Sequence, residues 1–497
     1  MCGIIALSGY EDVIQDLYDG LILLQHRGQD AAGIVTFNNQ FHLKKANGMV
    51  QDVFHAKSIE RLKGPIGIGH VRYPTAGCNS EFEAQPFFVN SPFGIALAHN
   101  GNLTNASELA RQLLEEEFCH LNTSSDSEVL LNVFAQALRR QRPKKLHPEI
   151  LFRAMRSVYR RCKGSYACVA LIGGQGIVGF RDPYGIRPLA IGKRKYGMKE
   201  EHIICSENSC MKGLGFEFLR DVAPGEAVFV DRKGQLHTRV CRKGTLSPCI
   251  FEWVYLAAHD SLLDRVSVYK ARVRMGELLA RQIAKAGIHI DSVIPVPDTS
   301  RAAAAGLADS LKIRYREALV KNRYIGRTFI MPGQEMRQRS LRFKIHPIEL
   351  EFRKNSVLLV DDSIVRGTTM RKIVEMARSA GAKKVYVASA SPPLRSPCPY
   401  GVDMPTYDEF IAHDRTIEEV RRAIGADGLF YLKIEDLISA VRRGNPKIKT
   451  FCTGCMNGRY ATPEVTKRLL LEMGRGRNET RAAESQESGE GGLLSLV

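Results

Sequence analysis

The sequence lacks any long uninterrupted apolar run, and its longest hydrophobic stretches have only the length of a β-strand. A membrane-spanning helix needs about 20 predominantly apolar residues, so we expect none here. The first residues also lack a basic segment followed by a long apolar core, so we expect no secretory signal peptide. Together these absences favour a cytoplasmic protein.

Acidic residues are comparatively few. The 497 residues include 53 acidic and 71 basic side chains, which gives a formal net charge of +18. No zinc-finger spacing and no aromatic residues interleaved with the basic ones accompany this charge, which argues against nucleic-acid binding. The dispersed basic residues form either an ordinary solvated surface or a field that attracts anionic substrates.

Internal repeats are also absent, and a chain of this length is too long for one ordinary core. Short strands and turns dominate residues 2–240, whereas strand and helix patterns alternate over residues 241–470, as in a parallel sheet. We place the boundary near residue 240, within the polar, turn-rich stretch 231–248. Residues 471–497 are rich in Arg, Glu, Gly and Ser, which is typical of a disordered tail.

The most informative stretch is residues 357–369, which read VLLVDDSIVRGTT. They predict a buried strand that ends in two acids, followed by a polar turn and a helix whose apolar residues recur at helical spacing. In an open parallel sheet, ligands bind at the carboxyl ends of the strands. The N–H groups of such a turn, at a helix N-terminus, suit a phosphate group. By charge alone, the two acids could equally be a solvated strand end or a helix cap.

The chain has 12 cysteines, and one of them directly follows Met1. Removal of Met1 would give Cys2 a free α-amine, which titrates near pH 8 and can accept the proton of its own thiol. Cys2 would then supply both a nucleophile and a base. On its own, however, the Met-Cys-Gly sequence is also compatible with an incidental cysteine.

Motifs in both halves of the chain resemble known families. Residues 25–33, 69–77, 98–102, 124–128 and 181–188 are similar, in order and spacing, to the glutaminase domain of class II, N-terminal-nucleophile amidotransferases. Residues 357–369 resemble the 5-phosphoribosyl-1-pyrophosphate (PRPP) motif of type I phosphoribosyltransferases. Residues 294–300 and 321–329 are similar to the pyrophosphate and substrate-closing loops. Over residues 2–470 the combination resembles the glutamine-dependent PRPP amidotransferases.

This resemblance implies a two-domain chain of the α/β and α+β classes. Its first domain is an αββα sandwich and its second a parallel-sheet phosphoribosyltransferase. The implied reaction converts PRPP, glutamine and water into 5-phosphoribosylamine, glutamate and pyrophosphate, the first committed step of purine biosynthesis. The resemblance assigns catalysis to Cys2, Asn100 and Gly101, where Cys2 attacks the glutamine amide and the other two stabilise the oxyanion.

The remaining implied site residues bind substrates. Glutamine binding is implied for Arg27, Arg72, Thr75 and Asp126. The residues implied to bind PRPP are Asp361, Asp362, Ser363, Arg366, Gly367, Thr368, Thr369, Lys321 and Arg327. Mg²⁺ binding is implied for Thr299, Asp361 and Asp362. For His26, His70 and His99 we expect structural roles, since the α-amine of Cys2 already serves as the base.

Four further cysteines match the ligand positions of the iron–sulfur branch of this family: Cys249, Cys398, Cys452 and Cys455. Four thiolates satisfy a four-iron, four-sulfur cluster without other ligands. Zinc also accepts four cysteines, and four buried cysteines that never meet are the third possibility. Residues 424–445 resemble the cluster-free branch instead.

The resemblance further implies feedback inhibition by AMP and GMP, and a homodimer or homotetramer. Two other functions stay open. The chain could be a PRPP-sensing regulator that has lost catalysis, although Cys2, the oxyanion pair and the pyrophosphate loop argue against this. It could also be a glutamine-dependent transferase that acts on another phosphosugar.

Overall fold

A computed structural model describes residues 2–73, 81–142, 144–322, 345–403 and 406–475. The chain divides into two compact units. The first unit comprises Met1–Pro248, Cys398–Asp403 and Ala461–Val497, and the second comprises Cys249–Pro397 and Met404–Tyr460. Among the described residues, no helix is both long enough and apolar enough to cross a bilayer.

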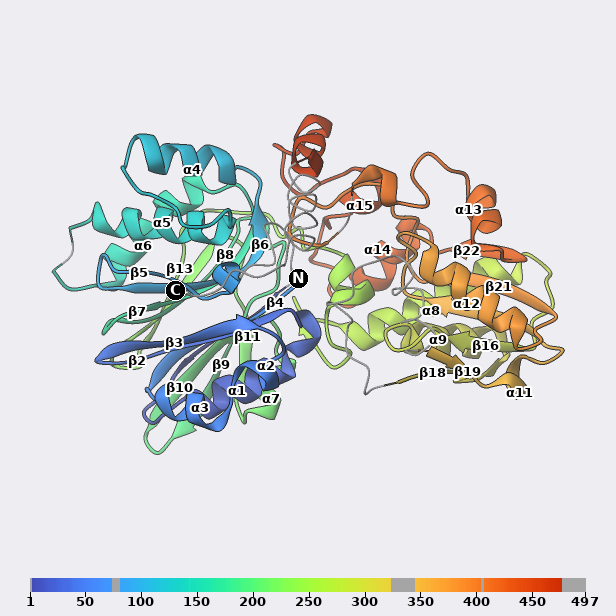
Figure 1. The fold of residues 1–497 in the computed structure, drawn as a ribbon, viewed down its shortest axis with the longest axis horizontal. Coiled ribbons are helices and arrows are strands. Elements are labelled where there is room, and N and C mark those ends of the chain that lie inside the picture. The colour runs from blue at the N-terminus through green and yellow to red at the C-terminus, as the bar shows by residue number, and fades with distance from the viewer. Residues whose placement is uncertain (1, 74–80, 143, 323–344, 404–405, 476–497) are drawn as a thin grey trace, which may run out of the picture. The chain divides into compact units, whose positions relative to one another are not determined.

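Two antiparallel sheets form the centre of the first unit (Figure 1). The strand order is β11-β9-β10-β1-β4-β2-β3 in one sheet and β13-β12-β8-β7-β6-β5 in the other. The strands are β1 (Gly3–Ser8), β2 (Ala31–Asn38), β3 (Gln40–Asn47), β4 (Ile66–Arg72), β5 (Phe87–Val89), β6 (Ile95–Leu103), β7 (Gly164–Ile172), β8 (Gly176–Arg181), β9 (Ala190–Tyr196), β10 (Lys199–Cys205), β11 (Glu217–Asp221), β12 (Glu226–Asp231) and β13 (Leu236–Val240).

Helices cover the outer faces of both sheets. A core of small and branched side chains that includes Ile4, Ile68 and Val169 fills the space between the sheets. Helix α1 (Ile14–Leu23), α2 (Val50–Val53), α3 (Ala56–Arg61) and α7 (Ser209–Gly213) pack on one outer face. Helix α4 (Ala106–Glu115), α5 (Asp126–Arg139) and α6 (Pro148–Arg161) pack on the other. The expected αββα sandwich is therefore confirmed.

The polar stretch that we expected to separate the halves contains a strand. β13 pairs with β12 at the edge of its sheet, and the chain leaves the first unit only after Pro248. An edge strand needs polar exposed residues, so its composition resembles that of a linker. Residues 467–475 are helical, which corrects the start of the expected tail, and residues 476–497 lie outside the described residues.

The second unit contains a five-stranded parallel sheet in the order β17-β16-β20-β21-β22. These strands are β16 (Ser292–Pro295), β17 (Arg314–Tyr315), β20 (Ser356–Asp361), β21 (Lys384–Ser389) and β22 (Gly428–Tyr431). The antiparallel pairs β14 (Leu262–Leu263) with β15 (Val266–Ser267), and β18 (Leu319–Lys321) with β19 (Ile345–Pro347), stand beside it.

Helices alternate with these strands along the chain, as predicted for this half. The longer ones are α8 (Val268–Ala284), α9 (Arg301–Leu311), α12 (Thr368–Ser379), α13 (Ile417–Ile424) and α14 (Ile434–Arg442). The apolar stripe of α12 packs into the same core as β20 and β21. Single turns complete the unit at α11 (Glu349–Phe352) and α15 (Gly454–Asn457).

Candidate functional sites

Cys2 lies immediately before β1, in the first unit, and is buried. Its backbone N–H donates to Asn100 Oδ1 at 3.2 Å, and its thiol points toward the carbonyl oxygen of Tyr73 at 3.9 Å. The carbonyl oxygen of Cys2 accepts a hydrogen bond from Arg27 Nε at 3.1 Å. The structure therefore brings together three of the residues that the sequence analysis selected.

Asn100 and Gly101 are consecutive residues of strand β6, and Asn100 lies beside this cysteine. Asn100 is fully buried, and its Nδ2 has no hydrogen-bond partner among the described residues. A buried donor without a partner costs about 1–3 kcal/mol, which is reasonable where negative charge develops during a reaction. Gly101 has φ +152°, and a Cβ there would lie 2.1 Å from the carbonyl oxygen of Ser165.

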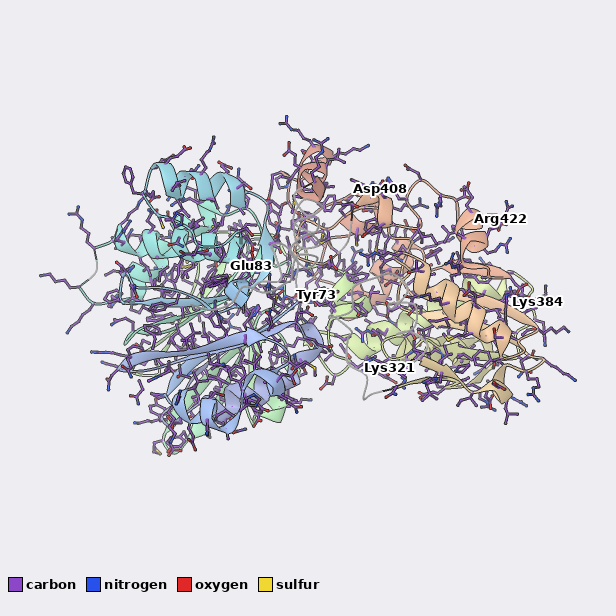
Figure 2. The ribbon with its side chains drawn as sticks, in the orientation of Figure 1. Tyr73, Glu83, Lys321, Lys384, Asp408 and Arg422 are labelled. Atoms are coloured by element: carbon purple, nitrogen blue, oxygen red, sulfur yellow. The ribbon has the colours of Figure 1, made fainter. Side chains whose placement is uncertain are left out.

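Arg72 ends β4 and is buried, as a ligand for a substrate carboxylate should be. In this structure its Nη2 donates to Glu83 Oε2 at 2.7 Å, and Ser124 Oγ donates to the other carboxylate oxygen at 2.8 Å. Glu83, labelled in Figure 2, was missed by the sequence analysis. The sequence feature that could have indicated Glu83 is its position as an acid in the short polar stretch that follows Arg72 and Thr75. Thr75 lies outside the described residues.

Asp126 is the first residue of α5, but it does not cap this helix. Ser125 is the N-cap, and its side chain accepts the N–H of Ser127. Asp126 Oδ2 instead accepts the backbone N–H of Leu103 at 2.8 Å. The carboxylate therefore ties the end of β6 to α5, beside the oxyanion donors.

The neighbours of Arg27 explain its position. Its buried guanidinium contacts the carboxylate of Glu207, which also lies 2.9 Å from His26 Nε2. Because the same guanidinium holds the Cys2 carbonyl oxygen, Arg27 fixes the backbone of the nucleophile. Glu207 is a second residue that the sequence analysis missed.

His70 lies on β4 and is completely buried. Burial, reinforced by the nearby Arg72 guanidinium, lowers the pKa of His70 to about 3. A neutral buried ring suits the structural role that we expected for His70. His99 also contacts a neighbouring side chain, since its Nδ1 lies 3.0 Å from Ser127 Oγ.

This histidine predicts how stability changes with pH. The unfolded chain binds a proton at His70 below about pH 6.5, whereas the folded chain does so only near pH 3, so stability falls as the pH falls through this window. From pH 7 to pH 5 the loss from this one group is about 2 kcal/mol. Chemical denaturation of wild type and His70→Asn at both pH values measures it. An equally large pH dependence in the variant would contradict this assignment.

In the second unit, the predicted strand, turn and helix over residues 357–369 are confirmed as β20, a turn and α12. Asp361 is the last residue of the strand, and Gly367 precedes the helix with φ +74°. A Cβ at Gly367 would lie 2.2 Å from Ile411 Cδ1, so both backbone conformation and space require glycine there.

The two adjacent acids have raised pKa values. Burial, together with the neighbouring Asp362 carboxylate, raises the pKa of Asp361 well above its usual range. Burial raises the pKa of Asp362 to about 6, although Ser363 Oγ donates to its Oδ1 at 2.8 Å. Two carboxylates that resist ionisation side by side suit a site where a divalent cation binds.

Lys321, labelled in Figure 2, ends β18 and points to the loop after β16. Its Nζ donates to Asp298 Oδ2 at 2.7 Å, and Arg301 Nη1 lies 3.4 Å from Oδ1 of the same carboxylate. Thr299 is half-buried in this turn. Arg327 lies outside the described residues.

A cavity of about 400 Å³ adjoins the turn between β20 and α12. Arg366, Gly367 and Thr368 line it, together with Arg371, Arg415 and His413. Arg366 donates to Glu409 Oε2 at 2.8 Å. The arginines that line the cavity make it suitable for an anionic ligand.

The four candidate metal-binding cysteines are divided between the two units. Cys249 and Cys452 pair through a parallel backbone bridge, and Cys455 lies in α15 three residues after Cys452. Cys398 belongs to the first unit, where its Sγ accepts the N–H of Tyr400 at 3.4 Å. Within the described part of the chain, no group of three or more His, Cys, Asp or Glu side chains is arranged to hold a metal ion. None of the described cysteines forms a disulfide.

Both halves of the chain match known domain families. A glutamine amidotransferase domain matches residues 70–212, and a phosphoribosyl transferase domain matches residues 268–394. The structure is similar to that of the Bacillus subtilis glutamine PRPP amidotransferase complexed with ADP and GMP, with a TM-score of 0.82 and 36% identity. That likeness covers 94% of this chain and 99% of the other.

Curated relatives extend this match over nearly the full length. The amidophosphoribosyltransferase of Escherichia coli is 53% identical over 494 residues, which is 98% of each chain. That of Pseudomonas aeruginosa is 54% identical over 490 residues, again 98% of each. With both domain matches in the same order, this chain belongs to the amidophosphoribosyltransferase family.

Proposed function

We propose that this amidophosphoribosyltransferase works through two sites, with Cys2 releasing ammonia from glutamine and residues 357–369 presenting PRPP to it. The observation that carries the glutaminase assignment is the buried Asn100 Nδ2, which has no partner among the described residues and stands beside Cys2. Such a donor is satisfied only when an oxyanion forms next to it.

The residues around Cys2 account for each step of glutamine hydrolysis. The thiol of Cys2 attacks the side-chain amide carbon, and its proton passes to the α-amine left by removal of Met1. Asn100 Nδ2 and the Gly101 N–H donate to the resulting oxyanion. The α-amine passes this proton to the leaving nitrogen, so collapse of the oxyanion expels ammonia and leaves a thioester, which water hydrolyses to glutamate. Arg27 holds the Cys2 carbonyl oxygen in place throughout.

Glutamine binding uses one partner of each charge. Arg72 and Thr75 hold the α-carboxylate of glutamine, and Asp126 holds its α-ammonium group. In this structure Arg72 donates to the carboxylate of Glu83, so the α-carboxylate of glutamine has to replace that of Glu83.

Residues of the second unit bind PRPP for attack by ammonia at the ribose C1, from which pyrophosphate departs. The turn from Ser363 to Thr369 donates N–H groups to the 5′-phosphate. Asp361 and Asp362 face the ribose hydroxyls, and with Thr299 they would hold Mg²⁺, which neutralises pyrophosphate charge when bound. Lys321 and Arg327 contact the pyrophosphate. Ammonia has to reach this site before it is protonated and lost.

A comparison of glutamine and ammonia as nitrogen donors tests this proposal. Wild-type protein should form 5-phosphoribosylamine from PRPP with either glutamine or ammonia, and should hydrolyse glutamine. If it shows none of these activities while still binding PRPP, the alternative of a PRPP-sensing regulator is correct.

The proposal also covers nucleotides and assembly. The Bacillus subtilis relative was solved with ADP and GMP. A nucleotide carries the same 5′-phosphate as PRPP, so the turn that suits one suits the other. We expect AMP and GMP to inhibit the enzyme and the chain to form a homodimer or homotetramer.

Cys249, Cys398, Cys452 and Cys455 are the proposed ligands of a structural four-iron, four-sulfur cluster. The bridge between Cys249 and Cys452 and the position of Cys455 in the next turn support it. The N–H donated to Cys398 Sγ also suits a thiolate ligand. Zinc is the competing metal, because it also accepts four thiolates.

Metal analysis of anaerobically purified protein should find about four irons per chain with broad visible absorbance. Cys455→Ser should lower the iron content, whereas Cys241→Ser, a half-buried cysteine outside the set, should not. Zinc in place of iron contradicts the cluster, and metal-free protein contradicts any metal at these cysteines.

A further inference from the structure

Residues 398–403, which we call the inserted segment, pack in the first unit, although the residues before and after them belong to the second. The segment contacts β6 and β7 and the buried side chain of Arg187. Tyr400 is itself buried, and its hydroxyl lies 2.7 Å from Thr462 Oγ1. The segment is therefore integral to the core of the first unit.

The Tyr400 carbonyl oxygen has an unusually dense set of donors. Arg187 donates to it from Nε at 3.0 Å and from Nη2 at 2.5 Å, and Ser165 Oγ donates at 3.1 Å. Both side chains are fully buried. Hydrogen bonds from a buried guanidinium are strong and directional, so this carbonyl is held in one place. One residue earlier, the Pro399 carbonyl oxygen accepts Asn102 Nδ2 at 3.0 Å.

Gly401 lies directly against Gly101. It has φ +84°, and a Cβ there would lie 2.4 Å from the carbonyl oxygen of Gly101 and 2.7 Å from its carbonyl carbon. On Gly101 itself, the corresponding Cβ position would meet the Ser165 carbonyl oxygen. The backbone of Gly101 is thus confined between β7 and the inserted segment.

We infer that the inserted segment positions the oxyanion donors, with Gly401 and the Arg187-bound Tyr400 carbonyl as the positioning groups. The inference rests on the proposed role of Asn100 and Gly101. Donors stabilise an oxyanion only when they are aimed at its position in advance, and a displacement of about 1 Å is costly. The segment contacts the carbonyl group of Gly101 and the side chain of Asn102, so it fixes the backbone that carries the Gly101 N–H.

Gly401→Ala tests this role, because its methyl group must displace Gly101. We expect the kcat for glutamine hydrolysis to fall about 10- to 100-fold, while the KM for glutamine changes less than about 2-fold. The alkylation rate of Cys2 by iodoacetamide, followed by peptide mapping, should stay within about 2-fold, because alkylation forms no oxyanion. Ammonia-dependent activity should persist and reports that the chain is folded.

Gly197→Ala is the matched control, since Gly197 also has a positive φ, of +59°, but no described atom lies within 4 Å of its Cβ position. Equal kcat values in the two variants would overturn the inference, as would a Cys2 alkylation rate that falls together with kcat. If Gly401→Ala does not fold, Asn102→Ala replaces it, because this variant removes the hydrogen bond to the Pro399 carbonyl oxygen. The same changes in kcat, KM and alkylation rate are expected of it. Inactive wild type would instead contradict the proposed function.

Discussion

Cys2→Ala should abolish glutamine-dependent formation of 5-phosphoribosylamine and leave the ammonia-dependent reaction intact. We expect the glutamine rate to fall by about 10⁴-fold or more, because removal of a covalent nucleophile removes the whole hydrolytic pathway. The ammonia rate should stay within about 2-fold, since Cys2 takes part only in glutamine hydrolysis in the proposed mechanism. Steady-state assays with each nitrogen donor measure both effects.

A buried thiol elsewhere in the first unit provides the control. Cys162 is buried, and burial raises its pKa to about 12, so it is chemically inert. Cys162→Ala should therefore keep both activities, apart from any loss of stability. Glutamine use by Cys2→Ala would show that another residue is the nucleophile.

Asp361→Asn and Asp362→Asn should each inactivate the acceptor reaction with both donors. Each amide retains the shape of the acid but loses the charge that, in the proposed mechanism, would hold Mg²⁺ and face the ribose hydroxyls. We expect kcat/KM for PRPP to fall about 10³-fold, comparable to the removal of other electrostatic groups at reaction centres. Basal glutamine hydrolysis should remain.

The same two variants should be more stable than wild type. A carboxylate with a raised pKa in the folded state destabilises that state at neutral pH, so removing its charge should raise the free energy of unfolding by about 1–3 kcal/mol. Chemical denaturation without Mg²⁺ measures this gain, with Asp309→Asn on the exposed end of α9 as the control. Lower stability in both variants would show that the acids support the fold rather than the ligand.

Local patterns were sufficient to predict several parts of the molecule. The strand and turn of residues 357–369 and the helix that follows are set by Gly367 and by side-chain periodicity, which the helix shows at Met370, Ile373, Val374 and Ala377. The αββα sandwich and the parallel sheet follow from the resemblance and agree with the structure. The linker was misjudged because β13, as a polar edge strand, has the composition of a loop.

Contacts between distant residues could not be predicted in this way. Glu83 and Arg72 form an ion pair. The fold, and not the separation of these residues in the sequence, brings their charges together. The inserted segment is the clearest case, because Asn102 and Pro399 are 297 residues apart. Nothing in the local sequence of either residue indicates the other.

The sequence by itself determined the chemistry that we propose for this protein: a nucleophile at Cys2, an acidic PRPP turn at Asp361 and Asp362, and their order along one chain. These are short motifs whose residue types and spacing carry the reaction. Only the tertiary structure decided what holds each group in position. Arg27 on the Cys2 carbonyl, the Asn100 Nδ2 that has no partner among the described residues, and Gly401 against Gly101 all arise from packing between remote segments, where sub-ångström placement is set by buried contacts.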